Sequence, residues 1–243
     1  MEEQSVQEND ISKIPQKSAG DHVHKAIRIA ASGIPVVGGC VTEIFTAIIT
    51  PPLERRRDEW VQSIAVELIN LKKVEEGFSI DKLSDNESFI TTVTHATQAA
   101  IRNHQKEKIE ALRNAVLNSA MPNPPNDDLQ LIFINQIDIL TPWHLRLLAL
   151  LDNPIEIGKQ KGVTYPNWQQ SSRKAIVEYI YPELKDKPEF TSMLAKDLFN
   201  RGLISTDTIT VGMLHIGLFQ SCTTTMGKQF IEFIKHPLSS TKH

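Results

Sequence analysis

Few residues in this chain combine a reactive side chain with a spacing that supports chemistry. His22 and His24 offer two nitrogen ligands for a transition metal, but no third ligand is in view, so we predict no metal site. Asp127 and Asp128 could form a carboxylate pair for acid–base catalysis. They follow a proline-rich break, however, where acidic residues stabilise a helix N-terminus. We therefore predict that this pair begins a helix.

Sequence motifs of common enzyme classes are missing as well. The chain contains no G-x-S-x-G, P-loop, G-x-G-x-x-G or H-E-x-x-H pattern. Cys40 and Cys222 lie far apart, which indicates neither a disulfide framework nor a zinc site and fits a reducing, cytoplasmic location. We predict a non-enzymatic protein without catalytic residues, cofactor or metal, which acts by binding a protein partner or by self-association.

The first candidate contact surface is the helix predicted over residues 190–200. Its side chains suited to contact with DNA or with a protein partner are Thr191, Ser192, Lys196, Asn200 and Arg201. A DNA reader needs basic or amide groups on the exposed face of its recognition helix, but Glu189 and Asp197 offset the two cations. Residues 139–236 carry 11 Lys or Arg against 9 Asp or Glu, so the region is nearly neutral. A protein partner is favoured over nucleic acid, and both interpretations stay open.

The second candidate is the apolar stretch over residues 29–53, in which Glu43 is the one charged residue. Proline and glycine near its middle argue against a single transmembrane helix. The pattern predicts a buried hairpin of two short helices folded about residues 33–39, with Glu43 paired to an arginine. The alternative is a membrane-active effector that is exposed only after a conformational change. The residues on which both interpretations depend are Ile44, Phe45, Ile48, Ile49, Arg55, Arg56 and Arg57.

Composition and periodicity then define the elements that must position these residues. The chain has 243 residues, of which 40 % are hydrophobic, and its net charge of −3 argues against a broadly basic surface. Residues 1–20 are polar without an apolar run, so we predict a disordered arm and no secretory signal. Residues 21–138 are predicted to form a helical bundle with helices over 22–32, 40–50, from 51 onward, from 85 or 86 through 101, 105–121 and 129–140.

The pattern changes at residue 140. Thr141 and Pro142 are an N-cap and first-turn pair that opens a helix to residue 151. Further helices are predicted near 168–181 and over 190–200 and 224–234, and β-like runs at 208–214 and 218–223 predict one small hairpin. This layout resembles a winged-helix module over 139–236, followed by a tail at 237–243. The fold class predicted is therefore mostly α, a helical bundle followed by a winged-helix-like module with one small β-hairpin.

The complete layout resembles the abortive-infection alpha family of bacterial helical proteins. The resemblance depends on the Gly/Pro-interrupted apolar N-terminal part, a helix at 108–120 and an apolar helix that enters 140–142. It depends also on the G-L-I motif at Gly202 and a T-x-x-G-x-x-F motif that ends at Phe230. The resemblance implies a role in phage defence or growth arrest. It carries no family residue with known chemistry.

Overall fold

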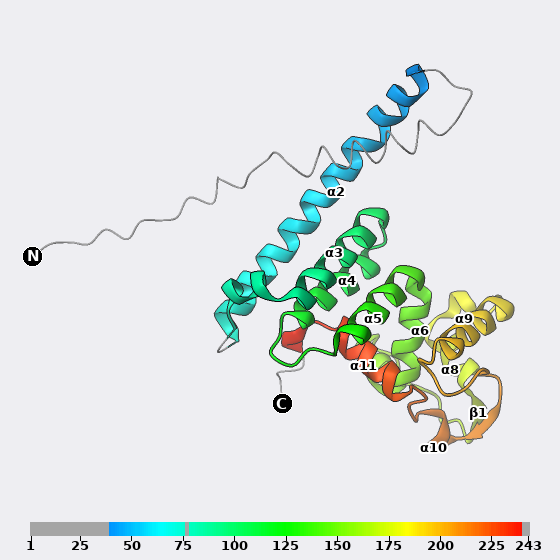
Figure 1. Ribbon diagram of the computed structural model, residues 1–243. Helices are drawn as coiled ribbons and strands as arrows, with labels where there is room; N and C mark the ends of the chain where they lie inside the picture. Colours follow the sequence, from blue (N-terminus) through cyan, green and yellow to red (C-terminus); the bar gives the residue numbers. More distant parts are fainter. Residues whose placement is uncertain (1–38, 76–77, 240–243) are drawn as a thin grey trace, which may run out of the picture. The chain divides into compact units, whose positions relative to one another are not determined.

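The computed structural model describes residues 39–75 and 78–239 of the chain (Figure 1). The prediction of a mostly helical protein with one small two-stranded β element is confirmed. The α-helices are α2 (Gly39–Val74), α3 (Glu87–Arg102), α4 (Lys106–Ser119), α5 (Asp127–Ile139), α6 (Pro142–Asp152), α7 (Pro154–Gln160), α8 (Arg173–Ile180), α9 (Pro188–Asn200), α10 (His215–Leu218) and α11 (Thr225–Ile234). The strands are β1 (Gln170–Ser172) and β2 (Gly212–Leu214), and short 3-10 helices lie at Ile80–Asp85, Pro182–Leu184 and Pro237–Ser239.

The chain divides into two units, Met1–Asp58 and Glu59–His243. In the first unit, the described residues are 39–58, all within α2. The predicted arm over residues 1–20 and the first helix of the predicted hairpin lie outside the described residues. The domain boundaries predicted at residues 21, 139 and 237 stay predictions.

Helix α2 corrects the expected break at Pro51 and Pro52. Both prolines lie inside the helix, which continues to Val74. A proline removes one backbone hydrogen bond and strains the helix locally, but it does not force the chain to reverse, and helix-forming residues follow it here. Near the end of the predicted buried stretch, Ile48 is 62 % exposed and Ile49 is half-buried. The prediction that this segment is buried is therefore wrong at Ile48. The side chains of Glu43, Ile44 and Phe45 lie outside the described residues.

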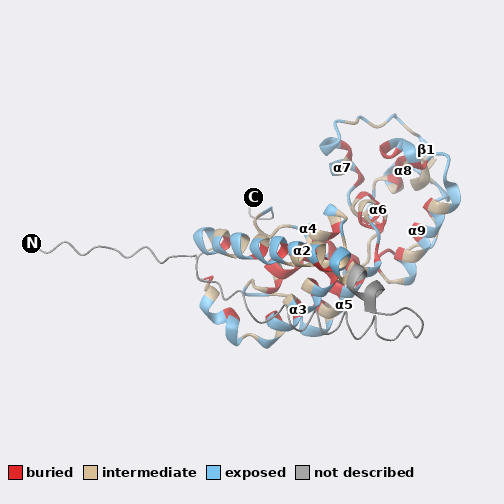
Figure 2. Ribbon diagram, turned by 90° about the horizontal axis from the view of Figure 1, so that it is seen from above, coloured by how far each residue is buried: buried red, intermediate tan, exposed pale blue. Residues whose placement is uncertain are grey.

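The core of the second unit begins with the three helices α3, α4 and α5, which pack against one another. Asparagine caps start two of them, because Asn86 accepts a hydrogen bond from the Phe89 N–H and Asn126 accepts one from the Leu129 N–H. Buried residues gather on the facing sides of these helices (Figure 2). The helices α4 and α5 agree closely with the spans predicted at 105–121 and 129–140.

Helix α6 is the most buried helix of the later part of the chain. Leu147, Leu148 and Leu150 are at most 1 % exposed, and α9 packs against the same helix. Helix α11 returns to α4, where the Asn114 Nδ2 donates to the Ile234 carbonyl at 2.9 Å and the Asn118 Nδ2 donates to the Phe233 carbonyl at 2.9 Å. These two amides satisfy carbonyls that the end of a helix leaves free. The final helix thus shares one core with the first half of the unit.

The two sequence motifs at Gly202 and Phe230 form one structural joint. Gly202 has φ +71°, the left-handed conformation that ends α9. Thr224 caps α11, since its hydroxyl accepts from the Gly227 N–H at 2.9 Å and donates to the Gly202 carbonyl at 2.5 Å. Phe230 is fully buried and packs edge-on against Phe133, with ring centroids 5.5 Å apart. The motifs behind the family resemblance therefore have a structural role.

The strand pairing differs from the hairpin expected within residues 208–223. β2 pairs in antiparallel register with β1, so that Gln170 lies opposite Leu214 and Ser172 opposite Gly212. A helical turn, α10, follows β2 directly and carries the chain away. Residues 222–224 instead lie beside 203–205, where the Ser205 N–H donates to the Cys222 carbonyl at 2.8 Å. The predicted hairpin partner is wrong because an extended run does not specify which strand it joins.

Candidate interaction surfaces

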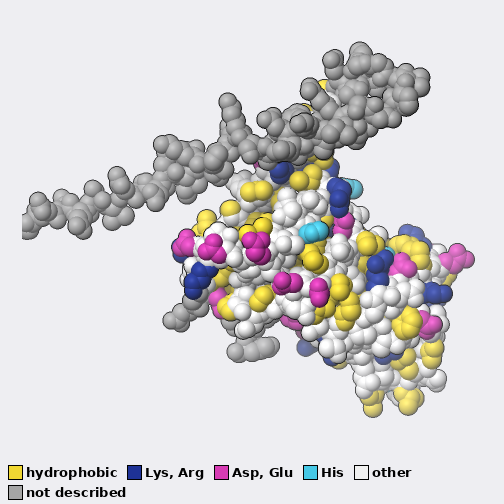
Figure 3. All heavy atoms as spheres, in the orientation of Figure 1, with side chains coloured by type: hydrophobic (Ala, Val, Ile, Leu, Met, Phe, Trp, Pro, Cys, Tyr) yellow, Lys and Arg dark blue, Asp and Glu magenta, His cyan; other side chains and the backbone are white. Residues whose placement is uncertain are grey.

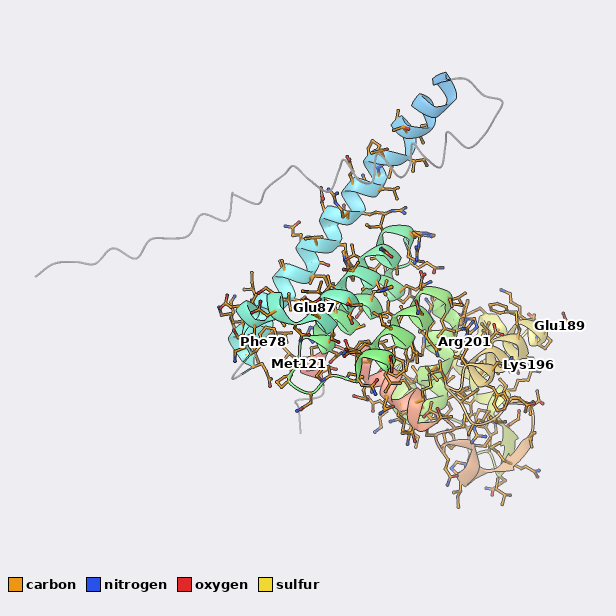
Figure 4. The ribbon with its side chains drawn as sticks, in the orientation of Figure 1. Phe78, Glu87, Met121, Glu189, Lys196 and Arg201 are labelled. Carbon is orange, nitrogen blue, oxygen red and sulfur yellow. The ribbon has the colours of Figure 1, made fainter. Side chains whose placement is uncertain are left out.

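The outer face of α9 contains three of the predicted contact residues. Ser192, Lys196 and Asn200 are exposed and share one face, because they are four residues apart. Thr191 is a correction: it is 1 % exposed, and its hydroxyl donates to the Lys187 carbonyl at 3.1 Å, so it is part of the core. Figure 4 shows Glu189 and Arg201 at the two ends of this helix, with Lys196 between them.

The fifth predicted residue, Arg201, is half-buried at the C-terminal end of α9. The carbonyl of Arg201 accepts from Gln136 Nε2 at 3.5 Å, and its Nε has no hydrogen-bond partner. Arg201 also lies near enough to His144 to disfavour protonation of that imidazole. Arg201 is therefore only partly accessible, whereas Lys196 is exposed.

His144 has the environment of a functional group, since it is 5 % exposed and contacts a carboxylate. Its Nε2 lies 3.4 Å from Asp197 Oδ2, and its Nδ1 lies 2.9 Å from the Thr141 hydroxyl. Burial lowers the pKa of His144, and the nearby carboxylate of Asp197 opposes that effect. The Thr141 hydroxyl, the His144 imidazole and the Asp197 carboxylate thus follow one another in the order of a catalytic triad.

The His144 imidazole caps a helix in this fold, which is a different role from that of a catalytic base. The Thr141 N–H donates to His144 Nδ1 at 3.1 Å, which completes a capping box at the start of α6. A nitrogen that accepts this bond is not free to take a proton from the hydroxyl. The arrangement therefore holds a helix end in place. Among residues 39–75 and 78–239, no group of three or more His, Cys, Asp or Glu is placed to hold a metal ion.

A third surface, which the sequence interpretation missed, lies at the end of the lobe that contains β1, β2 and α10. Three large aliphatic side chains project there: Val211 is 57 % exposed, Leu214 72 % and Ile216 77 %. We call these three residues the apolar tip. Figure 3 shows hydrophobic side chains on an otherwise uncharged surface at this end of the lobe.

The two segments that build the apolar tip contain no Asp, Glu, Lys or Arg. These segments are residues 162–172 and 208–227, in a chain whose charged residues make up 23 % of the whole. The hydroxyl of Tyr165 donates to the Pro154 carbonyl at 2.7 Å, and burial raises the pKa of Tyr165 to about 12. That ring therefore stays neutral at physiological pH, so the surface has no formal charge of its own while His215 is neutral.

The apolar tip is held in a defined conformation rather than in an open loop. Arg173 Nη2 donates to the Gly217 carbonyl at 3.2 Å, and the His215 N–H donates to the Gln169 carbonyl at 3.2 Å. Beneath these contacts lies a cluster of packed rings with centroids 5.0–6.2 Å apart: Tyr165, Trp168, Tyr179, His215 and Phe219. The fold therefore supports the aliphatic side chains in an outward position.

Comparison with known proteins identifies no relative. No family model, no curated protein and no solved structure matches the chain. The resemblance to the abortive-infection alpha family and the winged-helix interpretation therefore stay predictions. In the part of the chain that the structure describes, no helix has the length and apolar character needed to cross a membrane.

Proposed function

We propose that this protein functions by binding, and that the apolar tip is its contact surface. The observation that carries the proposal is the exposure of Val211, Leu214 and Ile216 in a segment, residues 208–227, that contains no Asp, Glu, Lys or Arg. Single exposed aliphatic residues are common on proteins, whereas several of them on one small lobe indicate an interaction site. Each of these side chains would contribute about 1.5–3 kcal/mol if it were fully buried, which makes the group a sufficient source of binding free energy.

The alternative of a DNA-binding regulator has less support. The exposed face of α9 offers one cation, Lys196, and Glu189 stands on the same face. Two large apolar side chains also emerge from this helix, since Met193 is 47 % and Phe199 41 % exposed. Binding to duplex DNA depends on several Lys or Arg contacts to phosphates. The composition of this face fits a protein contact better than a DNA contact.

The family resemblance implies a role in phage defence. A protein that functions by binding is compatible with that role. The membrane-active alternative over residues 29–53 has its apolar centre partly outside the described residues. In the described part of this stretch, Ile48 is the exposed large aliphatic residue, at 62 %.

Photo-crosslinking in cells tests the proposal, because it captures a partner whose identity is not yet established. A benzophenone amino acid is placed at position 216 in the full chain and, as a control, at Glu110, an exposed residue of α4. The proposal predicts a discrete adduct, to protein or to lipid, at position 216 and none at position 110. Adducts of equal yield at both positions, or no adduct at position 216, would contradict it.

A further inference from the structure

We infer that the partner of the apolar tip is the interface of a lipid bilayer, where the acyl chains meet the headgroups. This inference rests on the proposed function, since it names what the same three side chains bind. Peripheral binding of this kind needs no transmembrane helix. It requires a protruding apolar group that enters the bilayer and a neighbouring set of residues suited to the headgroup region.

The side-chain types of this lobe are those that a bilayer interface accepts: exposed aliphatic residues, tryptophan and tyrosine rings, and two cations. Leu214 and Ile216 are the most exposed aliphatic residues among those that the structure describes in this unit. Next to them lies the ring cluster, in which Tyr179 is 41 % exposed and Trp168 is half-buried. Tryptophan and tyrosine rings favour the headgroup level, because one end of each ring is apolar and the other is polar. Arg173 and Lys174 come after β1, at the start of α8.

The size of the apolar tip also favours a bilayer over a folded protein partner. A stable protein interface buries roughly 800 Å² on each partner. Three aliphatic side chains provide well under that area, given that even a buried aromatic side chain covers only about 150–250 Å². A bilayer requires no matching shape and no polar rim. The absence of charged residues from residues 162–172 and 208–227 also means that these segments carry no charge desolvation cost on entering a bilayer.

The cations nearest the apolar tip are already engaged within the protein. Lys174 Nζ lies 3.3 Å from Glu178 Oε1, and the guanidinium of Arg173 donates to the carbonyls of Gly217 and Gln220. Arg173 keeps its charge and Lys174 is paired with Glu178, so the tip lacks the cluster of about four to eight Lys or Arg that recruits anionic headgroups. Binding should therefore depend on the apolar side chains and only slightly on headgroup charge.

Vesicle flotation of the full-length protein tests the inference. The probes are vesicles of phosphatidylcholine alone and vesicles of phosphatidylcholine mixed with phosphatidylglycerol. We expect flotation with both and less than about a threefold difference between them. The double variant Leu214→Asn/Ile216→Asn should bind at least about tenfold more weakly, because it loses the two side chains that enter the bilayer.

The matched control is Ile132→Asn/Ile139→Asn on α5, whose two isoleucines are 41 % and 59 % exposed. It removes exposed apolar surface of a similar kind elsewhere and should float like the parent protein. A second readout is the fluorescence of Trp168. Brominated lipids should quench part of the emission, and Trp168→Phe should remove that quenched part. Retained thermal unfolding of all variants shows that each one is folded.

The outcomes separate this inference from the proposed function. If the protein floats with neither vesicle but position 216 still crosslinks to a protein, the inference of a bilayer partner is wrong. The proposal that the apolar tip is the contact surface is then retained. The protein could instead form a dimer in solution that the variant Leu214→Asn/Ile216→Asn dissociates. That result would show that the partner of the apolar tip is a second copy of the chain and not a bilayer. Flotation that appears only with phosphatidylglycerol, and that the double variant retains, would overturn the inference.

Discussion

At the scale of single residues, the unusual group is His144. The third helical position of a capping box is normally Glu or Gln, whose side chain reaches back to the backbone N–H of the cap. His144 does this through Nδ1 and places its other nitrogen near Asp197. Protonation at Nδ1 would remove the acceptor of the Thr141 N–H. The start of α6 is therefore coupled to the charge of one imidazole.

This coupling predicts a pH dependence of stability. Because the pKa of His144 is lowered in the folded protein, the unfolded chain binds the proton more tightly. The contribution of the neutral imidazole is complete above the ordinary pKa of 6.5 and is lost as the pH falls through the lower, folded value. The slope it adds is at most about 1.4 kcal/mol per pH unit, the limit for one proton.

The variant His144→Gln isolates this effect, because glutamine can keep the cap but does not titrate. Urea unfolding between pH 5 and pH 7 should show a smaller loss of stability at low pH than in the parent protein. His95→Gln, at an exposed position of α3, is the control and should keep the parent slope. Equal slopes for all three proteins would show that His144 does not govern the pH dependence.

Sequence reasoning reaches part of this site. Thr141 and Pro142 predict the start of a helix, and the structure confirms that α6 begins at Pro142. The sequence does not reveal that His144 is buried against α9, because Asp197 lies more than 50 residues away in the chain. Contacts between distant segments, which the local pattern does not encode, create the site.

At the scale of elements, the joint between α9 and α11 depends on Gly227. A Cβ atom at this position would collide with the Leu203 carbonyl, which is backbone and has no alternative rotamer. We predict that Gly227→Ala destabilises the protein by about 1–3 kcal/mol, the range for overpacking. Gly212→Ala is the control, since the nearest atom to its Cβ is Gln170 Nε2 at 3.6 Å, an ordinary contact. A free energy of unfolding for Gly227→Ala equal to that of the control would contradict this account of the joint.

Helix α9 supports a prediction about nucleic acid. Lys196 is the exposed cation on the predicted contact face, and Arg201 is half-buried. Fluorescence anisotropy with a duplex at low salt should give the same weak signal for the parent protein and for Lys196→Ala. Tight binding that falls steeply with salt and weakens in Lys196→Ala would restore the DNA-binding interpretation.

The elements also show where sequence patterns are sufficient. Helical periodicity with clear caps places α4, α5, α9 and α11 within a few residues of their observed ends. It fails where a local signal has more than one outcome. Pro51 and Pro52 predict a break, but an intact helix contains them, and the run at 208–214 predicts a strand without naming its partner. Tertiary packing decides which strand pairs with which, and whether a helix continues through a proline.

At the scale of the whole molecule, the apolar pattern of the sequence does not show which apolar residues remain exposed. The run that contains Val211, Leu214 and Ile216 predicts a strand in a hairpin. The same composition fits a buried strand and a projecting tip, because both contain alternating apolar residues. The signal that is present in the sequence is the absence of charge over residues 162–172 and 208–227, two separate segments that the fold brings together.

The inference of a bilayer partner requires no conformational change, because the apolar tip is already exposed in the structure. The sequence suggests a membrane role for residues 29–53, and only after a conformational change. The apolar tip is exposed without any rearrangement. Three surfaces therefore compete as the binding surface: the apolar tip, the outer face of α9, and the described part of the first unit, residues 39–58.

Amide hydrogen exchange of the full chain, measured with and without phosphatidylcholine vesicles, compares these three surfaces in one experiment. The account predicts slower exchange upon vesicle addition in peptides that cover residues 165–172 and 208–220, with no change in α9 or in residues 39–58. The variant Leu214→Asn/Ile216→Asn should lose this protection. Protection confined to α9 or to residues 39–58, with the apolar tip unchanged, would contradict the central claim that the protein binds through its tip.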